Sequence, residues 1–191
     1  IQKWQIEKKD FHNVDTITKR GLEFIEQNKK GPFLLILSHN TIHDPLLENQ
    51  ELIHKYQNKN GSEKKENNPT IGAMIETLDL SVGQIVKKLK NLKLFDNTLL
   101  IFCSDNGGNQ KYALQKPFKK GKGWLYEGGI RVPLIISWPR RIRNSFVSEQ
   151  MTSSIDFLPT ILNVTNSGLN DKSFYDGIDI SQVFYNKSNL I

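Results

Sequence analysis

Two polar side chains follow directly after a short apolar run of the kind expected in a buried strand. The run LLIFC, residues 99–103, leads through Ser104 into Asp105, Asn106 and two glycines. Carboxylate and amide oxygens suit hard cations such as Ca²⁺ or Mg²⁺ better than zinc. Ca²⁺ takes roughly six to eight oxygen ligands, so other segments or substrate oxygens would have to complete such a shell. The same residues also favour turns, and their spacing alone leaves both interpretations open.

Two histidines follow a second apolar run, residues 33–37. His43 lies in the loop SHNTIHDP, where it could act as a general acid or as a cationic contact to an anion. His39 is closer to the apolar run and is a weaker candidate. His12 and His54 lie in segments with no other sign of a site.

Lysines stand among glycines in the loop KKGKGWLYEGGIRVP. Lys119, Lys120 and Lys122 could neutralise an anion, and the glycines would let the backbone approach that anion closely. The loop is not a P-loop, because Gly123 stands where a Ser or Thr is required.

Three other residues favour a structural role over a chemical one. Glu127 and Arg131 could form a structural ion pair. Cys103, at the end of its strand, is expected to be a small core residue. As the only cysteine of the chain, it rules out an internal disulfide.

The elements around these residues alternate between helical and extended patterns. A helix is expected from Asp15, as its N-cap, to the Gly31-Pro32 pair. An apolar stripe predicts a second helix over residues 71–92. Residues 33–37 and 98–103 predict strands on either side of that helix, which favours a parallel pair. In open parallel sheets, functional groups gather at the carboxyl ends of such strands.

The remaining segments extend this α/β pattern. Residues 55–69 are so polar that an exposed loop or a mobile insertion is expected. Residues 133–138 predict a third strand. The segment SSIDFLPTILNV predicts a short helix, in which Pro159 must lie within the first turn or two. The tail from Thr165 onwards contains DGIDI, which could be a small strand or a docking segment.

The composition indicates one soluble globular domain with a basic surface. The chain has 191 residues, is 37% hydrophobic and carries a formal net charge of +6. No apolar run approaches the roughly 20 residues that cross a bilayer, so no membrane span is expected. The charge fits a solvated basic surface, which we favour, a site for sulfated or phosphorylated substrates, or, as the weakest interpretation, a nucleic-acid surface. The first residues have neither an initiator Met nor an apolar signal core, so we expect a cut N-terminus.

Four segments, taken in order, resemble the type I sulfatases of the alkaline phosphatase superfamily. They are PFLLILSHNTIHDPLL, NPTIGAMIETLDLSVGQIVKKLKNLKLFDNTLLIFCSDNGG, GKGWLYEGGIRVPLIISWP and SSIDFLPTILNV. The resemblance implies a partial alkaline phosphatase-like α/β domain, with a mostly parallel sheet flanked by helices. Residues 1–165 would be the C-terminal portion of the catalytic domain, and residues 166–191 a tail leading toward a further subdomain.

The matching motifs imply roles for four residues. Asp105 and Asn106 match ligands of the family's active-site calcium, a single ion whose shell would be completed by residues outside this chain. Lys122 matches the lysine that contacts the sulfate group. His43 matches the histidine that contacts the sulfate ester and can protonate the leaving oxygen. The resemblance implies a sulfated sugar or an aryl sulfate as substrate, no nucleic-acid partner, and an exported enzyme.

One departure from the family concerns the nucleophile. Family members use a formylglycine made from a cysteine, or a serine, in a Cys-x-Pro/Ala-x-Arg motif. Cys103 cannot be that residue, since Asp105 stands where Pro or Ala is needed and Gly107 where Arg is needed. We therefore expect a fragment of a sulfuric ester hydrolase, with the formylglycine upstream and no activity in the isolated chain.

Two alternatives stay open at this point. The first is a phosphodiesterase or phosphoethanolamine-type transferase of the same superfamily, which would use zinc or manganese. The Asp-Asn pair and the YEGGIRVP loop favour the sulfatase over it. The second is a non-catalytic protein that binds sulfated glycans, and the sequence upstream of Ile1 would decide between it and the enzyme.

Overall fold

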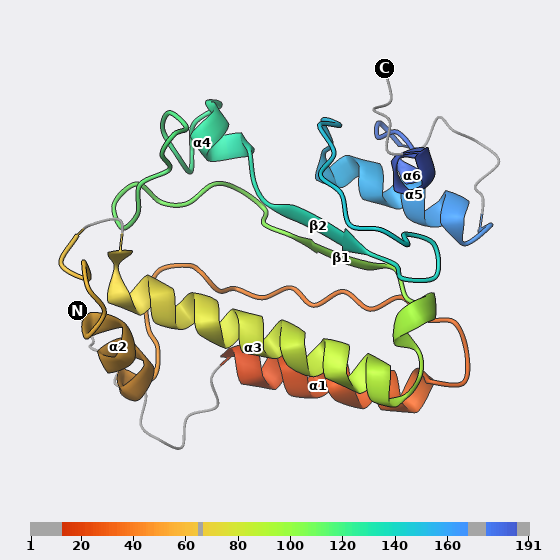
Figure 1. Cartoon of the computed structure of the whole chain (residues 1–191), viewed down its shortest axis with the longest axis horizontal. Helices are drawn as coiled ribbons and strands as arrows, with labels where there is room; N and C mark the ends of the chain where they lie inside the picture. Colours follow the sequence, from red (N-terminus) through yellow and green to blue (C-terminus); the bar gives the residue numbers. More distant parts are fainter. Residues whose placement is uncertain (1–12, 65–66, 168–174, 187–191) are drawn as a thin grey trace. The chain divides into compact units, whose positions relative to one another are not determined.

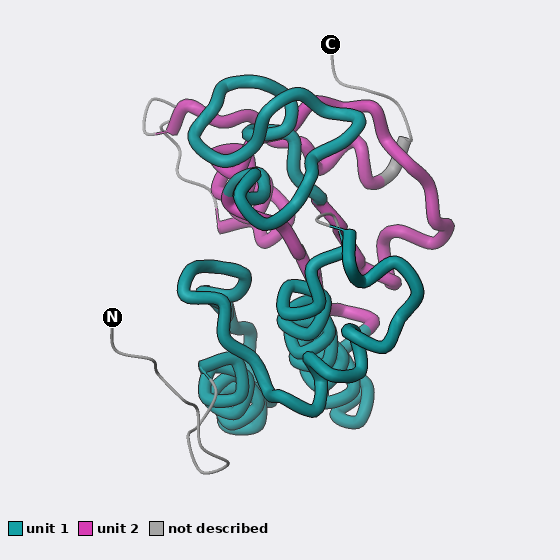
Figure 2. The backbone as a smooth tube through the Cα atoms, turned by 90° about the vertical axis from the view of Figure 1, so that its left-hand side faces the viewer, with its two compact units in different colours: residues 1–95, 106–133 teal, residues 96–105, 134–191 magenta. Residues whose placement is uncertain are grey.

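The computed structural model describes residues 13–64, 67–167 and 175–186. The chain divides into two compact units, which Figure 2 colours separately. Unit 1 comprises residues 1–95 and 106–133, and unit 2 comprises residues 96–105 and 134–191. His12, which had no predicted role, lies outside the described residues.

Helices α1 (Asn13–Asn28) and α3 (Pro69–Asn91) form the core of unit 1 and lie side by side in Figure 1. The buried positions of α1 recur at helical spacing and are Val14, Thr18, Gly21 and Ile25. The predicted helix is confirmed. Its predicted N-cap is wrong, because α1 begins at Asn13 and Asp15 therefore lies inside the first turn. A carboxylate there still favours the helix, since it faces the positive end of the helix dipole.

Helix α3 confirms the predicted apolar stripe and has a well-defined start. The side chain of Asn68 accepts hydrogen bonds from the backbone N–H groups of Thr70 at 3.0 Å and Ile71 at 3.2 Å. Pro69 occupies the first turn, where its missing N–H costs nothing. The buried side chains Ala73, Met74, Ser81, Ile85 and Leu89 form the face that packs on the other helices of unit 1.

Helix α2 (Gln50–Gln57) corrects the predicted boundary of the polar segment 55–69. Residues 55–57, the first three of that segment, belong to α2. Asn49 caps the first turn of this helix, and Ile53 anchors the helix against α3. Lys55 also donates to both carboxylate oxygens of Glu76 on α3, at 2.7 Å each. The turns that follow α2 run over the surface as expected, and residues 65–66 lie outside the described part of the chain.

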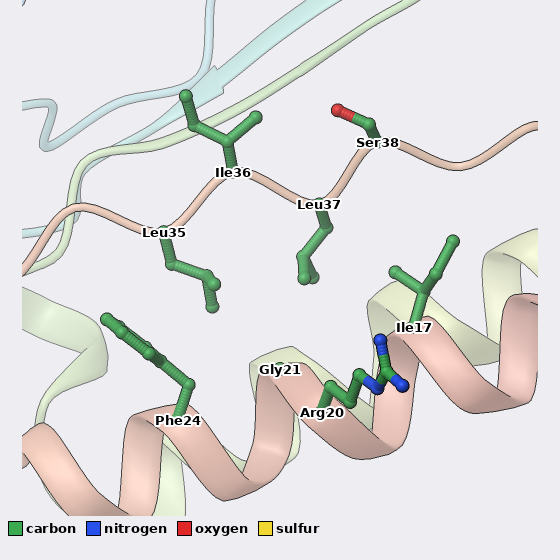
Figure 3. A pocket seen from close by; sticks show the side chains of 8 residues that line it. All are labelled: Ile17, Arg20, Gly21, Phe24, Leu35, Ile36, Leu37 and Ser38. Atoms are coloured by element: carbon green, nitrogen blue, oxygen red, sulfur yellow. The ribbon is translucent and has the colours of Figure 1, made fainter.

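Residues 33–37 are extended but form no strand, contrary to the prediction. Leu35 and Leu37 point toward α1 in Figure 3, whereas Leu34 and Ile36 are 63% and 76% exposed. One face of this segment is thus covered within unit 1. A ladder also needs a hydrogen-bonded neighbour, and no described residue pairs with the segment. The parallel pair expected with residues 98–103 is therefore absent from the described part of the chain.

The two strands of the described sheet belong to unit 2. Strands β1 (Leu100–Cys103) and β2 (Leu134–Ser137) pair antiparallel, with Leu100 opposite Ser137 and Cys103 opposite Leu134. They confirm the strands predicted over residues 98–103 and 133–138, with shorter ends. The 3₁₀ helix η2 (Phe95–Asn97) precedes β1.

The core of unit 2 lies beneath helices α5 (Phe157–Val164) and α6 (Ser181–Asn186). The short 3₁₀ helix η3 (Ser154–Asp156) leads into α5, and Pro159 is the third residue of α5, as predicted. The DGIDI run is a docking segment, not a strand. Ile178 donates from its backbone to Asp156 at 2.8 Å, and Ile180 donates to the Thr160 hydroxyl at 3.0 Å. Ile180 then packs with residues of β2, α5 and α6. None of the helices in the described residues is long and apolar enough to cross a membrane.

Candidate functional site

The lysine-rich loop of unit 1 is fastened to the turn that follows Asn106. The N–H of Gly107 donates to the carbonyl of Gly129 at 2.9 Å, and the N–H of Lys122 donates to the carbonyl of Gly108 at 3.0 Å. The loop then continues into the short helix α4 (Glu127–Ile130). Backbone hydrogen bonds therefore bring together two segments that the sequence separates by more than a dozen residues.

This crossing explains why both segments are rich in glycine. A Cβ atom added to Gly107 would lie 1.8 Å from the carbonyl oxygen of Gly128. One added to Gly121 would lie 2.5 Å from the carbonyl oxygen of Gly108. Backbone atoms cannot move aside as the end of a flexible side chain can, so the crossing requires glycine at both positions.

Three lysines extend from this loop into different surroundings. The ammonium of Lys119 lies 4.3 Å from the ring centroid of Tyr126, and that of Lys120 lies 4.2 Å from the ring centroid of Trp124. The side chain of Lys122 is exposed, and its backbone N–H is bonded to the Gly108 carbonyl, two residues after Asn106.

His43 is exposed at the end of the 38–44 loop of unit 1. Its Nδ1 lies 2.9 Å from the backbone oxygen of Asp44, which can only accept, so Nδ1 carries a proton. Proton exchange therefore falls to Nε2. Lys111 lies near this loop, and its pKa is raised. The largest cause is its hydrogen bond with Tyr112, and the charges of Tyr112 and Asp44 raise the pKa further.

His39 belongs to a chain of hydrogen bonds that fixes its tautomer. The Thr18 hydroxyl donates to the Val14 carbonyl at 2.6 Å, so it must accept from Ser81, also at 2.6 Å. Ser81 has one proton, so its oxygen accepts from Nε2 of His39 at 3.3 Å. The other ring nitrogen, Nδ1, is buried and has no hydrogen-bond partner among the described residues. Burial lowers the pKa of His39, which favours this neutral form.

This chain joins α1, α3 and the loop that carries His43. Sequence reasoning ranked His39 below His43 and gave Thr18 and Ser81 no role. Their sequence separations, 63 residues between Thr18 and Ser81 and 42 between Ser81 and His39, explain why. A single hydroxyl on a helix gives no signal until its partner is placed against it.

Asp105 and Asn106 are consecutive, but the division between the two units falls between them. Asp105 is exposed at the end of the β1 segment, and Asn106 is half-buried at the start of the glycine crossing. A carboxylate and an amide oxygen fit part of a hard-cation shell by their chemistry. Within the described ranges, no group of three or more His, Cys, Asp and Glu side chains is placed to hold a metal ion. The role of Asp105 and Asn106 as metal ligands stays a prediction.

Cys103 corrects another expectation. Its side chain is exposed and not part of the core, because it occupies the last position of β1. Partial burial, and secondly the charge of Asp105, raise the pKa of its thiol. A raised pKa keeps the thiol protonated at neutral pH, which is the opposite of what a nucleophile requires.

Glu127 and Arg131 form the predicted ion pair. Arg131 donates to the Glu127 carboxylate at 3.2 Å, and both side chains are more than half exposed. The Arg131 guanidinium also lies 5.0 Å from the ring centroid of Phe118. These contacts hold the end of the lysine-rich loop.

A groove that the sequence did not indicate runs between α1 and residues 35–38 (Figure 3). Its walls are mainly apolar, from Ile17, Phe24, Leu35 and Leu37, and Arg20 supplies a charge. None of the four predicted site residues lines it. The groove is therefore separate from the candidate site.

The sequence matches the Sulfatase family over residues 2–167. The chain belongs to the sulfatase family. Steryl-sulfatase of Homo sapiens is 32% identical over 189 residues, which cover 92% of this chain and 31% of the relative. N-acetylgalactosamine-6-O-sulfatase of Bacteroides thetaiotaomicron is 31% identical over 166 residues, which cover 80% of this chain and 30% of the relative. The chain thus spans about a third of the length of these curated relatives.

Solved sulfatase structures share the fold of this chain. The structure of Ps i-CgsB in complex with k-i-k-neocarrahexaose has a TM-score of 0.83 at 31% identity, and the match covers 93% of this chain and 39% of that one. The sulfatase yidJ from Bacteroides fragilis has a TM-score of 0.78 at 26% identity, covering 93% and 42%. The fold is therefore the α/β, alkaline phosphatase-like fold of the sulfatases, as predicted, although the two described strands run antiparallel.

Proposed function

We propose that this sulfatase chain supplies the sulfate-binding and leaving-group side of a calcium-dependent, formylglycine sulfatase. The observation that carries the proposal is the hydrogen bond from the Lys122 N–H to the Gly108 carbonyl. It fixes the lysine matched to sulfate binding beside the turn that follows the two matched metal ligands. Residues 1–165 would belong to the catalytic domain, and residues 166–191 to a tail. By resemblance to its family, the enzyme would be exported.

The roles of the side chains follow from the charge of a sulfate monoester. The ester carries one negative charge, and more charge collects on the leaving oxygen as the S–O bond breaks. The Lys122 ammonium would offset charge on a non-bridging sulfate oxygen. The His43 imidazolium would donate from Nε2 to the leaving oxygen, because Nδ1 is already engaged with Asp44. Asp105 and Asn106 would hold the calcium ion, which supplies positive charge against the sulfate oxygens when bound.

A sulfated carbohydrate is the substrate class that we favour. The support is that one relative is named for N-acetylgalactosamine-6-O-sulfate chemistry and that the Ps i-CgsB structure contains a neocarrahexaose. A steryl or aryl sulfate is the alternative that the other named relatives suggest. A nucleic acid is not expected as a partner.

The metal assignment is tested by Asp105→Ala in the full-length enzyme. We expect loss of calcium binding in calorimetry and at least a hundredfold lower turnover of an aryl sulfate, because an oriented charge at such a site contributes roughly 10²–10³ in rate. Asp96→Asn is the matched control. Asp96 is exposed, and its backbone oxygen, not its carboxylate, accepts a hydrogen bond from the Arg140 N–H. Tightly bound zinc with little calcium would contradict the proposal and favour the phosphodiesterase or transferase alternative.

The 191-residue chain by itself should not turn over sulfate esters. Its only cysteine is not part of a Cys-x-Pro/Ala-x-Arg motif, so Cys103 cannot be the precursor of the family's nucleophile. An aryl sulfate assay of the isolated chain checks this expectation. Activity that disappears in Asp105→Ala would show that the chain carries a complete site. Absence of the motif from the full-length protein would instead favour a non-catalytic glycan-binding protein.

A further inference from the structure

Two exposed aromatic rings and two lysines form a single surface on the loop around Lys122. We call this surface the aromatic–lysine platform, and it consists of Lys119, Lys120, Trp124 and Tyr126. The rings of Trp124 and Tyr126 are 49% and 45% exposed. Their centroids lie 6.5 Å apart, with the ring planes tilted by 41°. Each ring has one lysine ammonium over it, at 4.2 and 4.3 Å.

The backbone of the platform is held in place on both sides of Lys122. Before Lys122, the Lys119 carbonyl accepts from the Gly128 N–H at 3.0 Å. After it, the Trp124 N–H donates to Gly121 at 3.1 Å, and the Tyr126 carbonyl accepts from the Gly129 N–H at 2.7 Å. A surface fixed in this way loses little conformational entropy on binding a ligand.

The chemistry of the platform fits a sugar that carries a negative charge. An exposed aromatic ring offers an apolar face against which the C–H face of a sugar ring can stack, and its polar edge stays hydrated. The lysines add cations within reach of the same ligand. An exposed cation–π contact contributes only about 0.5–1 kcal/mol, so either ammonium can leave its ring for a sulfate oxygen at small cost.

We propose that the platform binds a second sulfated sugar unit, next to the one whose sulfate Lys122 contacts. This inference rests on the proposed function, because it takes Lys122 as the sulfate contact. It specifies the substrate as a multiply sulfated oligosaccharide or polysaccharide. A small aryl or steryl sulfate would leave the platform without a ligand.

The test compares long and short ligands in the full-length protein by calorimetry. The ligands are a sulfated carrageenan hexasaccharide, its desulfated form and a sulfated monosaccharide. Trp124→Ala removes stacking, and the double variant Lys119→Ala/Lys120→Ala removes charge. Each should lower the ratio of hexasaccharide to monosaccharide affinity by roughly tenfold. The hexasaccharide should bind more tightly than its desulfated form.

A matched control separates the platform from net charge. Lys59 and Lys111 also lie over aromatic rings, at 4.2 Å from Tyr56 and 4.8 Å from Tyr112, but outside the platform. Lys59→Ala/Lys111→Ala removes the same charge, and the affinity ratio should stay at the wild-type value. An equal loss in both double variants would overturn the inference.

Three outcomes would overturn either the platform or the proposed function on which it rests, and each outcome identifies which of the two is wrong. A hexasaccharide that binds no better than the monosaccharide sulfate overturns the platform and leaves the proposed function standing. Monosaccharide binding that does not weaken in Lys122→Ala overturns the proposed function itself. A single-stranded oligonucleotide that binds as tightly as the hexasaccharide, and depends equally on Trp124, would make the platform a nucleic-acid surface and overturn the inference.

Discussion

At the scale of single residues, His39 shows how one protonation state is specified by groups far away in the sequence. The order of donors from His39 through Ser81 to Thr18 requires a proton on Nε2 of His39. Protonating Nδ1 would place a charge in a buried position that no described residue compensates. The lowered pKa of His39 has the same cause, which is burial.

We predict that His39 makes the protein less stable as pH falls. The unfolded chain takes up a proton on this residue near pH 6.5, whereas the folded chain does so only at lower pH, so stability falls below about pH 6.5. His39→Gln keeps a donor for Ser81 and cannot titrate. Its free energy of unfolding in urea should therefore change less between pH 7.5 and pH 5.5 than that of the wild type.

The control for this prediction is His54→Gln, which changes an exposed histidine. The pKa of Glu26 is lowered to about 2 by Lys29 and then by Lys88, so its contribution is lost only at more acidic pH. An identical pH dependence in wild type and His39→Gln would contradict the assignment. Labelled-histidine NMR, which separates the two tautomers, offers a second measurement.

At the scale of elements, the glycine crossing sets the position of the lysine-rich loop. We predict that Gly107→Ala lowers the free energy of unfolding by about 1–3 kcal/mol, because its Cβ would lie 1.8 Å from a backbone oxygen. Gly83→Ala should instead raise it by up to about 1 kcal/mol, since Gly83 is an exposed interior residue of α3 with nothing near its Cβ position. Urea unfolding of both variants measures this difference in sign. Equal effects would contradict the close backbone approach.

The same scale shows which elements the sequence could predict. Helices α1 and α3 were predictable because their apolar residues recur at the helical period over several turns. The strand predicted over residues 33–37 does not form. An apolar run indicates burial, but it cannot supply the hydrogen-bonded neighbour that a strand needs. Helix α2 was not predicted, and residues 55–57 were assigned to a polar loop, since Lys55 is fixed by Glu76, 21 residues further along the chain.

The candidate site was predictable to a different degree. The roles of His43, Asp105, Asn106 and Lys122 were predicted from motifs and stay predictions. Cys103 was misassigned, since strand position alone does not say which side chains are covered. The aromatic–lysine platform was missed because a lysine over a ring is a contact in space, which residue types do not reveal.

At the scale of the whole molecule, the net charge of +6 was compatible with three kinds of surface. Under the proposed function, the charge would attract an anionic substrate. Exposed Lys119 and Lys122 lie in the loop that also carries the platform, so part of the charge is concentrated near the proposed ligand. A field of this kind acts mainly on the rate of association and less on the rate of dissociation.

We therefore predict that the association rate of the sulfated hexasaccharide depends strongly on ionic strength. The Debye length falls from about 30 Å at 0.01 M to about 10 Å at 0.1 M, so the attraction reaches a smaller volume around the site. Stopped-flow measurements should show a several-fold slower association at the higher ionic strength and a smaller change in dissociation. The desulfated hexasaccharide should show almost no such change, because it carries no charge for the field to act on. An association rate that stays constant for the sulfated ligand would mean that the basic surface serves solubility and takes no part in substrate capture.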